Sequence, residues 1–344
     1  MTRYALLILP SANRVYAGAS TALTRAELEV FNRSVLRGRL REVSDATIGG
    51  VPYVTFAADG LDAGDAAYLA NLSSVYALFG IEGDLLRPVG LRPLGRFDDD
   101  LITIPKYAGK TNEQFTKLLL NVTLLSSAFA PAMLERQFAV LDPLCGRGTT
   151  LNQALMYGYD ATGIDLDQKD FEAYAAFIQA WLKRKRIKHH AERGPVRRNR
   201  QVLGRRLQIS LAAARDDYRA GVTQHLDLVN ADTTKALEIF RPASFDVVVA
   251  DAPYGVQHGS RTAAKGLARS PVDLLTQAAP VWARLLRSGG ACGIAWNTLV
   301  ARRDAAAEIL AGAGLEPLDS GPYLEFQHRV DQAILRDVLI ARRP

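Results

Sequence analysis

The chain of 344 residues has few cysteines and no long apolar run. Its two cysteines, Cys145 and Cys292, lie too far apart for a clustered metal site or a disulfide framework, which favours a reducing, cytoplasmic environment. No apolar stretch approaches the roughly 20 residues that a membrane-spanning helix needs, so we expect no membrane partner. The cysteine spacing likewise predicts no metal. The run Tyr4–Leu9 ends at Pro10 and polar residues follow, which predicts a first β-strand rather than a signal peptide.

The net charge of +6 is concentrated in one segment. Residues 183–206 contain 11 of the 42 Lys and Arg residues and one of the 36 acidic residues, so the rest of the chain is net negative. This favours a localised contact with a polyanion over a generally basic protein, with a solvated or disordered charge run as the alternative. Because aromatic residues are not interleaved, the segment is expected to hold phosphates rather than read bases. The candidate nucleic-acid-binding residues are Lys183, Arg184, Lys185, Arg186, Lys188, Arg197, Arg198 and Arg200.

The order of the expected elements divides the chain into two domains. Residues 1–86 read as strand, helix, strand, strand, helix and strand, with a capping box at 24–27 opening the first helix. This order predicts a small α+β ferredoxin-like domain. Residues 87–104, with two prolines and three consecutive aspartates, are expected to be a linker. Residues 105–344 alternate strand and helix around the basic insert 183–206. They close with two strands, 323–326 and 333–340, expected to form an antiparallel pair.

Residues 140–150 contain the first of two motifs, Val-Leu-Asp-Pro-Leu-Cys-Gly-Arg-Gly-Thr-Thr. An apolar strand that ends in an acid and a glycine-rich turn places ligand-binding groups at the carboxyl edge of an open α/β sheet. The motif resembles the S-adenosylmethionine (SAM) loop of class I methyltransferases, D-P-x-x-G-x-G-T, whose sheet is Rossmann-like. No third glycine follows Gly148, which disfavours an NAD site. The resemblance implies SAM contacts from Asp142, Pro143, Cys145, Gly146, Gly148 and Thr149.

Acidic residues after the next two strands could complete the cofactor site. The stretch 163–167 reads Gly-Ile-Asp-Leu-Asp. About 20 residues after the glycine-rich loop, Rossmann-like sites place the carboxylate that binds ribose hydroxyls. We therefore expect Asp165 to bind the ribose, with Asp167 second. Asp232 follows the next strand and is expected to accept a hydrogen bond from the adenine amino group.

The second motif, Val-Val-Val-Ala-Asp-Ala-Pro-Tyr at 247–254, resembles the D-P-P-Y signature of enzymes that methylate an exocyclic or amide nitrogen. Such an amine is a poor nucleophile, so a site must position it and accept its N–H bonds. We expect Asp251 to supply an acceptor, Pro253 to fix the turn and Tyr254 to stack on the target base. A base inside a helix would have to be flipped out to reach them. Ala252 stands where proline is commoner.

Together the motifs resemble those of the archaeal and eukaryotic type of tRNA guanine-N2 methyltransferases, the THUMP-associated methylases. The resemblance rests on Asp142–Thr149, Gly163–Asp165, Asp251–Gly255 and the closing His328–Val330. It implies a ferredoxin-like N-terminal domain and transfer of a methyl group from SAM to guanine N2 of tRNA. The residues before 105 leave little space for a full THUMP domain as well, so the basic segment is expected to help hold the RNA.

Two other functions fit the same motifs. A DNA adenine-N6 or cytosine-N4 methyltransferase uses the same amine chemistry, although no target-recognition domain is evident in the sequence. A non-catalytic SAM-binding RNA scaffold would retain the cofactor loop without the reaction. The sequence gives no indication that a partner subunit is required.

Overall fold

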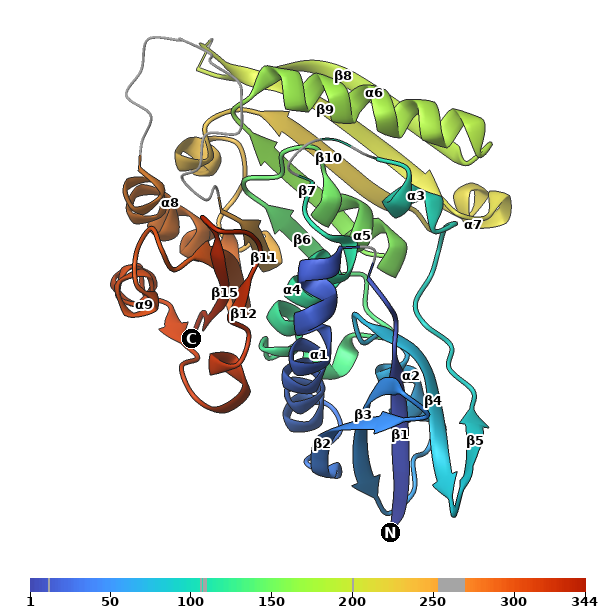
Figure 1. Ribbon diagram of the computed structural model, residues 1–344. Coiled ribbons are helices and arrows are strands. Elements are labelled where there is room, and N and C mark those ends of the chain that lie inside the picture. Colours follow the sequence, from blue (N-terminus) through green and yellow to red (C-terminus); the bar gives the residue numbers. More distant parts are fainter. Residues whose placement is uncertain (12, 106, 108–109, 200, 253–269) are drawn as a thin grey trace.

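The computed structural model describes residues 1–11, 13–105, 107, 110–199, 201–252 and 270–344. Its strands form two sheets, one of five strands near the N-terminus and one of ten strands in the rest of the chain (Figure 1). We call them the N-terminal unit and the large unit. None of the helices in the described ranges is both long and apolar enough to cross a membrane.

The N-terminal unit has the ferredoxin-like arrangement that the sequence predicts. Its antiparallel sheet has the order β2-β3-β1-β4-β5, and the first four of these strands follow the ferredoxin-like order. β5 adds a fifth strand that the sequence did not predict. The elements are β1 (Thr2–Ile8), α1 (Arg14–Ser34), β2 (Arg41–Ile48), β3 (Val51–Ala58), α2 (Ala63–Leu69), β4 (Val75–Glu82) and β5 (Leu85–Val89).

Helix α1 begins ten residues before the predicted capping box, so that prediction was wrong. The side chain of Asn13 caps the helix by accepting hydrogen bonds from the backbone N–H groups of Val15 and Tyr16. Thr24 lies inside the helix, where its hydroxyl donates to the carbonyl of Ser20. A threonine whose hydroxyl bonds back along the helix needs no cap position.

The large unit has the Rossmann-like α/β sheet that the sequence predicts. Its strand order is β13-β15-β12-β11-β6-β7-β10-β9-β8, with β14 paired to β15. The five central strands are parallel: β6 (Ala139–Asp142), β7 (Asp160–Asp165), β10 (Gln224–Asn230), β11 (Phe245–Asp251) and β12 (Leu286–Asn297). The antiparallel strands at the two edges are β8 (Lys188–Arg198), β9 (Gln201–Ala212), β13 (Glu316–Pro317), β14 (His328–Arg329) and β15 (Leu335–Arg342).

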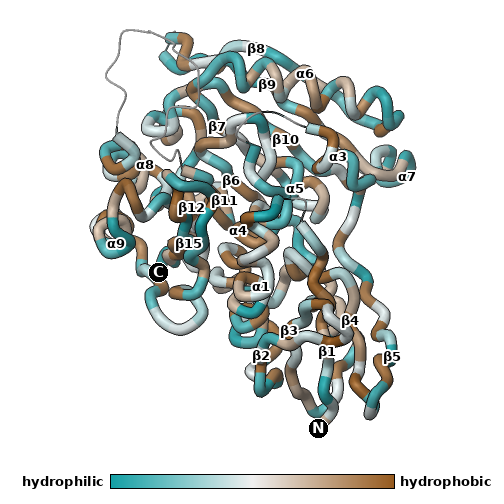
Figure 2. The backbone as a smooth tube through the Cα atoms, viewed as in Figure 1, coloured by the Kyte–Doolittle hydropathy of each residue, from teal (hydrophilic) through white to brown (hydrophobic). Residues whose placement is uncertain are grey.

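Helices cover both faces of this sheet because the buried strands alternate their side chains between two cores. Val247 and Val249 pack with α4, α5 and α6, whereas Val248 and Ala250 pack with α8 and α9. Hydrophobic residues accordingly run along the central strands (Figure 2). The helices of this unit are α3 (Asp100–Thr103), α4 (Glu113–Leu125), α5 (Thr149–Tyr157), α6 (Gln168–Arg184), α7 (Arg215–Arg219), α8 (Pro271–Leu285) and α9 (Arg303–Gly312), with short 3-10 helices η1 (Ala130–Ala132), η2 (Thr233–Glu238) and η3 (Gly321–Leu324).

The terminal antiparallel pair exists, but its first strand was misplaced by the sequence. Residues 321–324 form η3, which starts at Gly321 with a positive φ and carries Pro322 in its first turn. A proline and a left-handed glycine favour a tight turn over an extended strand. The strand that pairs with β15 is the short β14, in which His328 lies opposite Arg336.

A buried polar cluster joins the two units. Glu27 of α1 is fully buried and accepts hydrogen bonds from Ser73, which precedes β4, and from Asn121 of α4. Asn121 in turn accepts a hydrogen bond of 2.8 Å from the hydroxyl of Tyr157 on α5. Burial raises the pKa of Glu27 above its usual value. Helix α1 is therefore attached to the large unit through its buried face.

The segment between the two sheets is anchored at its aspartates. Lys185, at the end of α6, forms ion pairs of 2.7 Å with both Asp98 and Asp100. Asp100 also accepts a hydrogen bond of 2.8 Å from the indole N–H of Trp181. Part of the basic segment thus neutralises the acidic end of the connection.

Candidate functional site

The glycine-rich loop follows β6 at the carboxyl edge of the large sheet. The carboxylate of Asp142, at the end of β6, is buried and accepts hydrogen bonds from the backbone N–H of Leu144 and from the side chain of Thr150. Pro143 is buried beside it. Thr149 is the first residue of α5, so the loop turns directly into that helix.

Two glycines allow this loop to lie close to its neighbours. Gly148 has a φ of 76°, and a Cβ there would collide with the ring of Tyr174 on α6. A Cβ at Gly163 in β7 would meet the Sγ of Cys145 at 2.8 Å. Cys145 is buried against β7, and burial raises the pKa of its thiol well above the usual value. It fills space in the loop as a neutral side chain.

Asp165, at the end of β7, holds the loop from the neighbouring strand. Its carboxylate accepts hydrogen bonds of 2.7 Å from the backbone N–H groups of Gly146 and Asp167. Gly146 has a φ of 49°, which lets its N–H reach this acceptor. Asp142 and Asp165 therefore both lie against the loop, at adjacent strand ends.

Burial disfavours the charged forms of both carboxylates. Desolvation, together with the charges of Asp251 and Asp165, raises the pKa of Asp142 to about 7. Desolvation raises the pKa of Asp165 to about 6, although its two backbone hydrogen bonds oppose the shift. Such carboxylates are stabilised by a bound cation or by hydroxyl donors. Perturbed acids at the carboxyl edge of a parallel sheet are typical of a ligand site.

The other two predicted cofactor residues each cap a helix. Asp167 caps α6 by accepting a hydrogen bond of 2.7 Å from the backbone N–H of Lys169. Asp232 caps η2 through the N–H and hydroxyl of Thr234. These bonds position both carboxylates.

Asp251 ends β11, next to β6 in the sheet. Its carboxylate accepts a hydrogen bond from the hydroxyl of Thr111. Ala252 is buried, and its N–H donates to the carbonyl of Ala295 in β12 at 3.2 Å. The predicted residues Pro253 and Tyr254 lie outside the described residues.

Three residues near the loop were missed by the sequence analysis. The hydroxyl of Tyr107 bonds to Thr149, and burial raises its pKa to about 12. The guanidinium of Arg147 lies 4.8 Å from the centre of the Tyr107 ring and forms a 2.8 Å ion pair with Asp170. Thr111 and Tyr107 precede α4 and carry no motif, so only their position in the fold identifies them.

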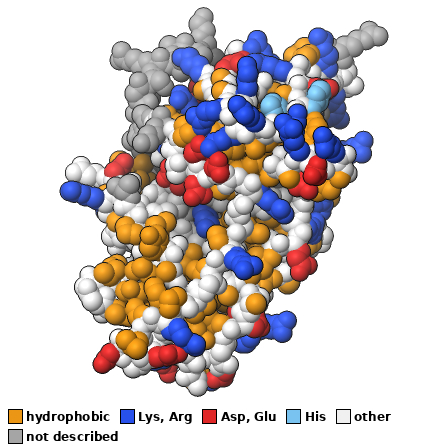
Figure 3. All heavy atoms as spheres, turned by 90° about the vertical axis from the view of Figure 1, so that its right-hand side faces the viewer, with side chains coloured by type: hydrophobic (Ala, Val, Ile, Leu, Met, Phe, Trp, Pro, Cys, Tyr) orange, Lys and Arg blue, Asp and Glu red, His pale blue; other side chains and the backbone are white. Residues whose placement is uncertain are grey.

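The basic segment is not an irregular charge run: it forms the end of α6 and the hairpin β8–β9. Basic side chains gather over this part of the large unit, whereas hydrophobic side chains are more frequent over the lower part of the same view (Figure 3). Several cations are already paired: Arg184 and Lys185 with the connecting aspartates, and Arg193 and Arg205 with Glu172. Lys183, Arg186, Lys188, Arg197 and Arg198 are exposed and have no acidic partner among the described residues. The predicted Arg200 lies outside the described residues.

The hairpin extends past the carboxyl edge of the sheet. Asn230, the last residue of β10, pairs with Arg205 of β9, and Arg205 pairs with Pro195 of β8. Residues 196–199 and 201–204 therefore reach beyond the edge at which Asp165 and Asp251 end their strands. Arg198 also donates to the carbonyl of Leu237 in η2 at 3.3 Å.

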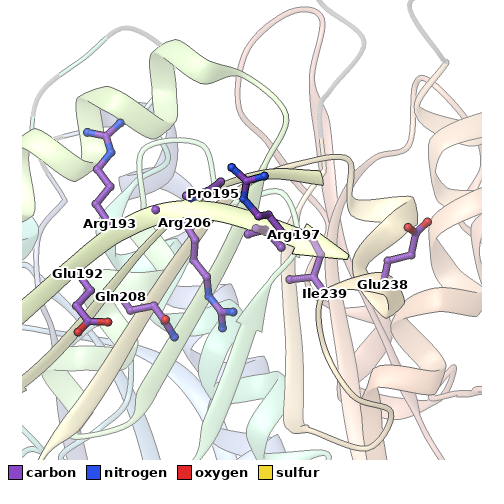
Figure 4. Close-up of a pocket in the computed structure, with 10 residues that line it drawn as sticks. Glu192, Arg193, Pro195, Arg197, Arg206, Gln208, Glu238 and Ile239 are labelled. Atoms are coloured by element: carbon purple, nitrogen blue, oxygen red, sulfur yellow. The ribbon is translucent and has the colours of Figure 1, made fainter. Parts of the chain in front are cut away.

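A cleft of about 340 Å³ lies between this hairpin and η2. Arg197 and Arg206 come from β8 and β9, and Glu238 lies on the opposite side (Figure 4). Arg193 points toward α6 in the same view. Arg206 is held by Asp227, which raises the pKa of its guanidinium. Arg197 is thus the exposed cation at this cleft without a described acidic partner.

Metal chemistry receives no support from side-chain clustering. Within the described ranges, no three or more His, Cys, Asp or Glu side chains are grouped so that they could hold a metal ion.

Local sequence similarity links the chain to curated methyltransferases. It is 36% identical over 128 residues to the ribosomal RNA large subunit methyltransferase K/L of Photobacterium profundum, covering 35% of this chain and 18% of that protein. The corresponding protein of Chromohalobacter salexigens is 32% identical over 148 residues, covering 41% of this chain and 20% of that protein. The chain thus matches only about a fifth of the length of these relatives. Among solved structures, TrmN from Thermus thermophilus aligns over 100% of both chains, with 13% identity and a TM-score of 0.46.

The sequence profile of one protein family covers the strands and loops described above. The RMKL-like methyltransferase domain profile, UPF0020, matches residues 118–292, about half of the chain. The match includes the loop after β6, Asp165 at the end of β7, Asp232 after β10, and Asp251. SAM is the methyl donor of this family, as the cofactor motif predicts. The chain belongs to the RMKL-like family of SAM-dependent methyltransferases.

Proposed function

We propose that this protein transfers a methyl group from SAM to the exocyclic N2 of guanine in RNA, with tRNA as the leading substrate. The observation that carries the proposal is the position of Asp251. Its carboxylate ends β11, beside the strand that supplies the cofactor loop, and Thr111 fixes it with a hydrogen bond. An oriented acceptor next to the methyl donor is what an amine acceptor requires.

The residues around the loop fit SAM. Asp142 and Asp165 are buried acids with raised pKa values, so a ligand that brings an ammonium group and ribose hydroxyls would offset their desolvation. In this proposal Asp142 holds the ammonium group, Asp165 holds the ribose with Asp167 second, and Asp232 accepts from the adenine amino group. Bound SAM supplies an electrophilic methyl group on a sulfonium.

The chemistry that remains for the protein is to position the amine and accept its protons. Asp251 accepts an N–H bond of the guanine amine, which orients the nitrogen lone pair toward the methyl carbon. The new N–C bond forms as the S–C bond breaks, leaving S-adenosylhomocysteine. One amine proton departs through the Asp251 carboxylate to solvent. In this proposal Pro253 and Tyr254 shape the turn and stack on the base.

Two features support a nucleic-acid substrate, and the second favours RNA. The exposed cations Arg197 and Arg198 project past the edge of the sheet that carries Asp251, where a phosphate backbone would pass a flipped nucleotide. The curated relatives are, by name, methyltransferases of large-subunit ribosomal RNA. Ribosomal RNA is therefore a second candidate substrate, favoured by that local identity.

The test is to incubate the purified protein with tritiated-methyl SAM and, separately, unmodified tRNA, unmodified large-subunit rRNA and genomic DNA. The labelled nucleoside is then identified by chromatography, with Asp251→Ala, which removes the acceptor, as the matched inactive variant. Label in N2-methylguanosine from tRNA supports the proposal, and the same nucleoside from rRNA alone moves it to the second substrate. Label confined to a DNA amine would overturn the choice of RNA. SAM binding without label on any substrate would favour a scaffold.

A further inference from the structure

A small cavity adjoins Asp251 and is not explained by cofactor binding. Its volume is about 50 Å³, and three parts of the chain line it: the start of α1, residues 110–112, and the C-terminal strands with His328 and Arg336. Thr111, the hydrogen-bond donor to Asp251, is part of the lining. The space accommodates the polar edge of a ring rather than a whole nucleotide.

His328 lines this cavity and carries a buried nitrogen that has no partner among the described residues. The side chain is 5% exposed, and its Nδ1 lies 2.9 Å from the carbonyl oxygen of Phe326. Because a carbonyl only accepts, Nδ1 carries the proton and Nε2 presents a lone pair. Nε2 has no hydrogen-bond partner among the described residues. A buried polar atom without a protein partner is satisfied by a water or by a ligand group.

The surroundings of His328 keep the ring neutral. Burial lowers its pKa to about 4, and the nearby charge of Arg336 acts in the same direction. The ring packs against Phe115 and Tyr16, with centroids at 5.2 Å and 6.0 Å. Nε2 is therefore an acceptor at neutral pH, in a ring whose orientation is fixed by packing.

Arg336 adds the opposite character to the same cavity. It is 4% exposed, and its guanidinium lies 4.2 Å from the centre of the Phe115 ring. A guanidinium can only donate. The cavity thus combines an acceptor from His328, a donor from Arg336 and, next to it, the acceptor Asp251.

This arrangement matches the Watson–Crick edge of guanine. That edge carries O6, which accepts, then N1–H and the N2 amine, which both donate. Adenine and cytosine instead present a lone pair at the ring nitrogen beside their exocyclic amine. That lone pair would face the lone pair of Nε2, so no hydrogen bond could form. Flipped bases are commonly read through this edge.

We propose that His328 is a specificity-determining residue that selects guanine by accepting its N1–H, while Arg336 donates to O6. This inference rests on the proposed guanine-N2 function and names the residue that selects guanine over the other bases. Helix α1 and residues 110–112 form the remaining walls, so both units shape the pocket.

The test compares guanosine with 2-aminopurine at the position that the wild-type protein methylates. 2-Aminopurine keeps the N2 amine but has a lone pair at N1 and lacks O6. RNA synthesised with either base is methylated under single-turnover conditions by the wild type, His328→Ala and His328→Gln. The control is His225→Ala, which changes an exposed histidine at the start of β10. SAM affinity and thermal unfolding are measured for each variant.

We expect the wild type and His225→Ala to prefer guanine by about 100-fold or more, since a site that loses a buried hydrogen bond discriminates strongly. His328→Ala should reduce the preference by about 10-fold or more. His328→Gln should retain more guanine activity than His328→Ala and still lose preference, because its amide can also donate. 2-Aminopurine also lacks the O6 atom that Arg336 would contact. This loss is the same for the wild type and every variant, so it does not change the comparison between them.

The outcomes separate this inference from the function on which it rests. If the wild type labels guanine N2 and either folded His328 variant keeps the full preference, the role of His328 is overturned and the proposed function stands. If the wild type labels an adenine or cytosine amine, or no RNA at all, both are overturned. A variant that fails to unfold cooperatively leaves the other variant to decide.

Discussion

The hydroxyl of Thr111 donates a hydrogen bond to the carboxylate of Asp251, across 140 positions of the sequence. Thr111 directly precedes Asn112, whose side chain caps α4 by accepting from the N–H of Phe115 at 3.1 Å. The start of α4 thereby fixes the orientation of the carboxylate at the end of β11. Changing Thr111 to Val keeps the branched shape and removes the donor. We expect kcat to fall by about 10-fold or more, since a hydrogen bond to a charged group is worth about 1.5–3 kcal/mol.

The dissociation constant for SAM, measured by calorimetry, should stay the same in Thr111→Val. The reason is that Thr111 contacts Asp251, which faces the methyl acceptor in this proposal. Thr111→Ser restores the hydroxyl and should recover most of the rate. An unchanged kcat in Thr111→Val would show that the orientation of Asp251 does not depend on this contact.

Gly148 and Gly146 provide a matched pair for the cofactor loop. Both have a positive φ, but a Cβ at Gly148 meets the ring of Tyr174 whereas a Cβ at Gly146 meets nothing within 4 Å. Gly146→Ala should therefore reduce the free energy of unfolding by about 1–2 kcal/mol through backbone strain alone. Gly148→Ala should cost more, because steric overlap adds to the same strain. Urea unfolding measures both. Equal losses would mean that Tyr174 moves aside freely.

The buried Asp142 should couple stability and cofactor affinity to pH in opposite directions. Its folded-state pKa of about 7 lies above its ordinary value of 3.8, so the folded protein binds more protons between these limits. The stability of the ligand-free protein should consequently fall as pH rises from about 4 to about 7. SAM affinity should rise over the upper part of that range, because the ammonium group needs the carboxylate.

Asp142→Asn should remove both effects. It should raise the free energy of unfolding at pH 8 by about 1–3 kcal/mol, because one pKa unit corresponds to about 1.4 kcal/mol, while weakening SAM binding. Calorimetry at pH 5 and pH 8 gives both quantities. A SAM affinity that has the same pH dependence in the variant as in the wild type would assign the titration to another group.

The hairpin tip is expected to bind phosphates. Arg197→Ala with Arg198→Ala should weaken RNA binding by about 10-fold at moderate salt and reduce the salt dependence by about two charges, with SAM affinity unchanged. The matched control is Arg219→Ala with Arg241→Ala, since these exposed residues precede β10 and β11 at the opposite edge of the sheet. Filter binding over a salt series measures the effect. Equal losses in both double variants would indicate a general charge effect.

The parts of the fold that follow from local periodicity were predicted from the sequence. The apolar runs that became β6, β7 and β11 end in Asp142, Asp165 and Asp251, and the structure brings these ends to one edge. The start of α1 was predicted wrongly because Thr24 and Glu27 imitate a capping box, while their side chains serve the helix interior and the junction with Ser73.

The hairpin and the small cavity could not be predicted in the same way. Strand β8 and the first half of β9 are largely exposed and rich in arginine, so they lack the alternation of apolar residues that marks a half-buried strand. The cavity unites Asn13, Thr111 and His328 from distant parts of the chain. Only tertiary packing places such residues together, and no local spacing records it.

The polar cluster around Glu27 should make the two units unfold as one cooperative structure. The Glu27 carboxylate accepts hydrogen bonds from Ser73, just before β4, and from Asn121 of α4. Asn121 also donates to the carbonyl of Asn71 and accepts from the hydroxyl of Tyr157. Separating the units would leave these buried groups without partners, which costs more than losing apolar contact alone. The protein should accordingly unfold in one transition rather than two. Exchange of the N-terminal unit between relatives would then succeed only if this polar junction is exchanged with it.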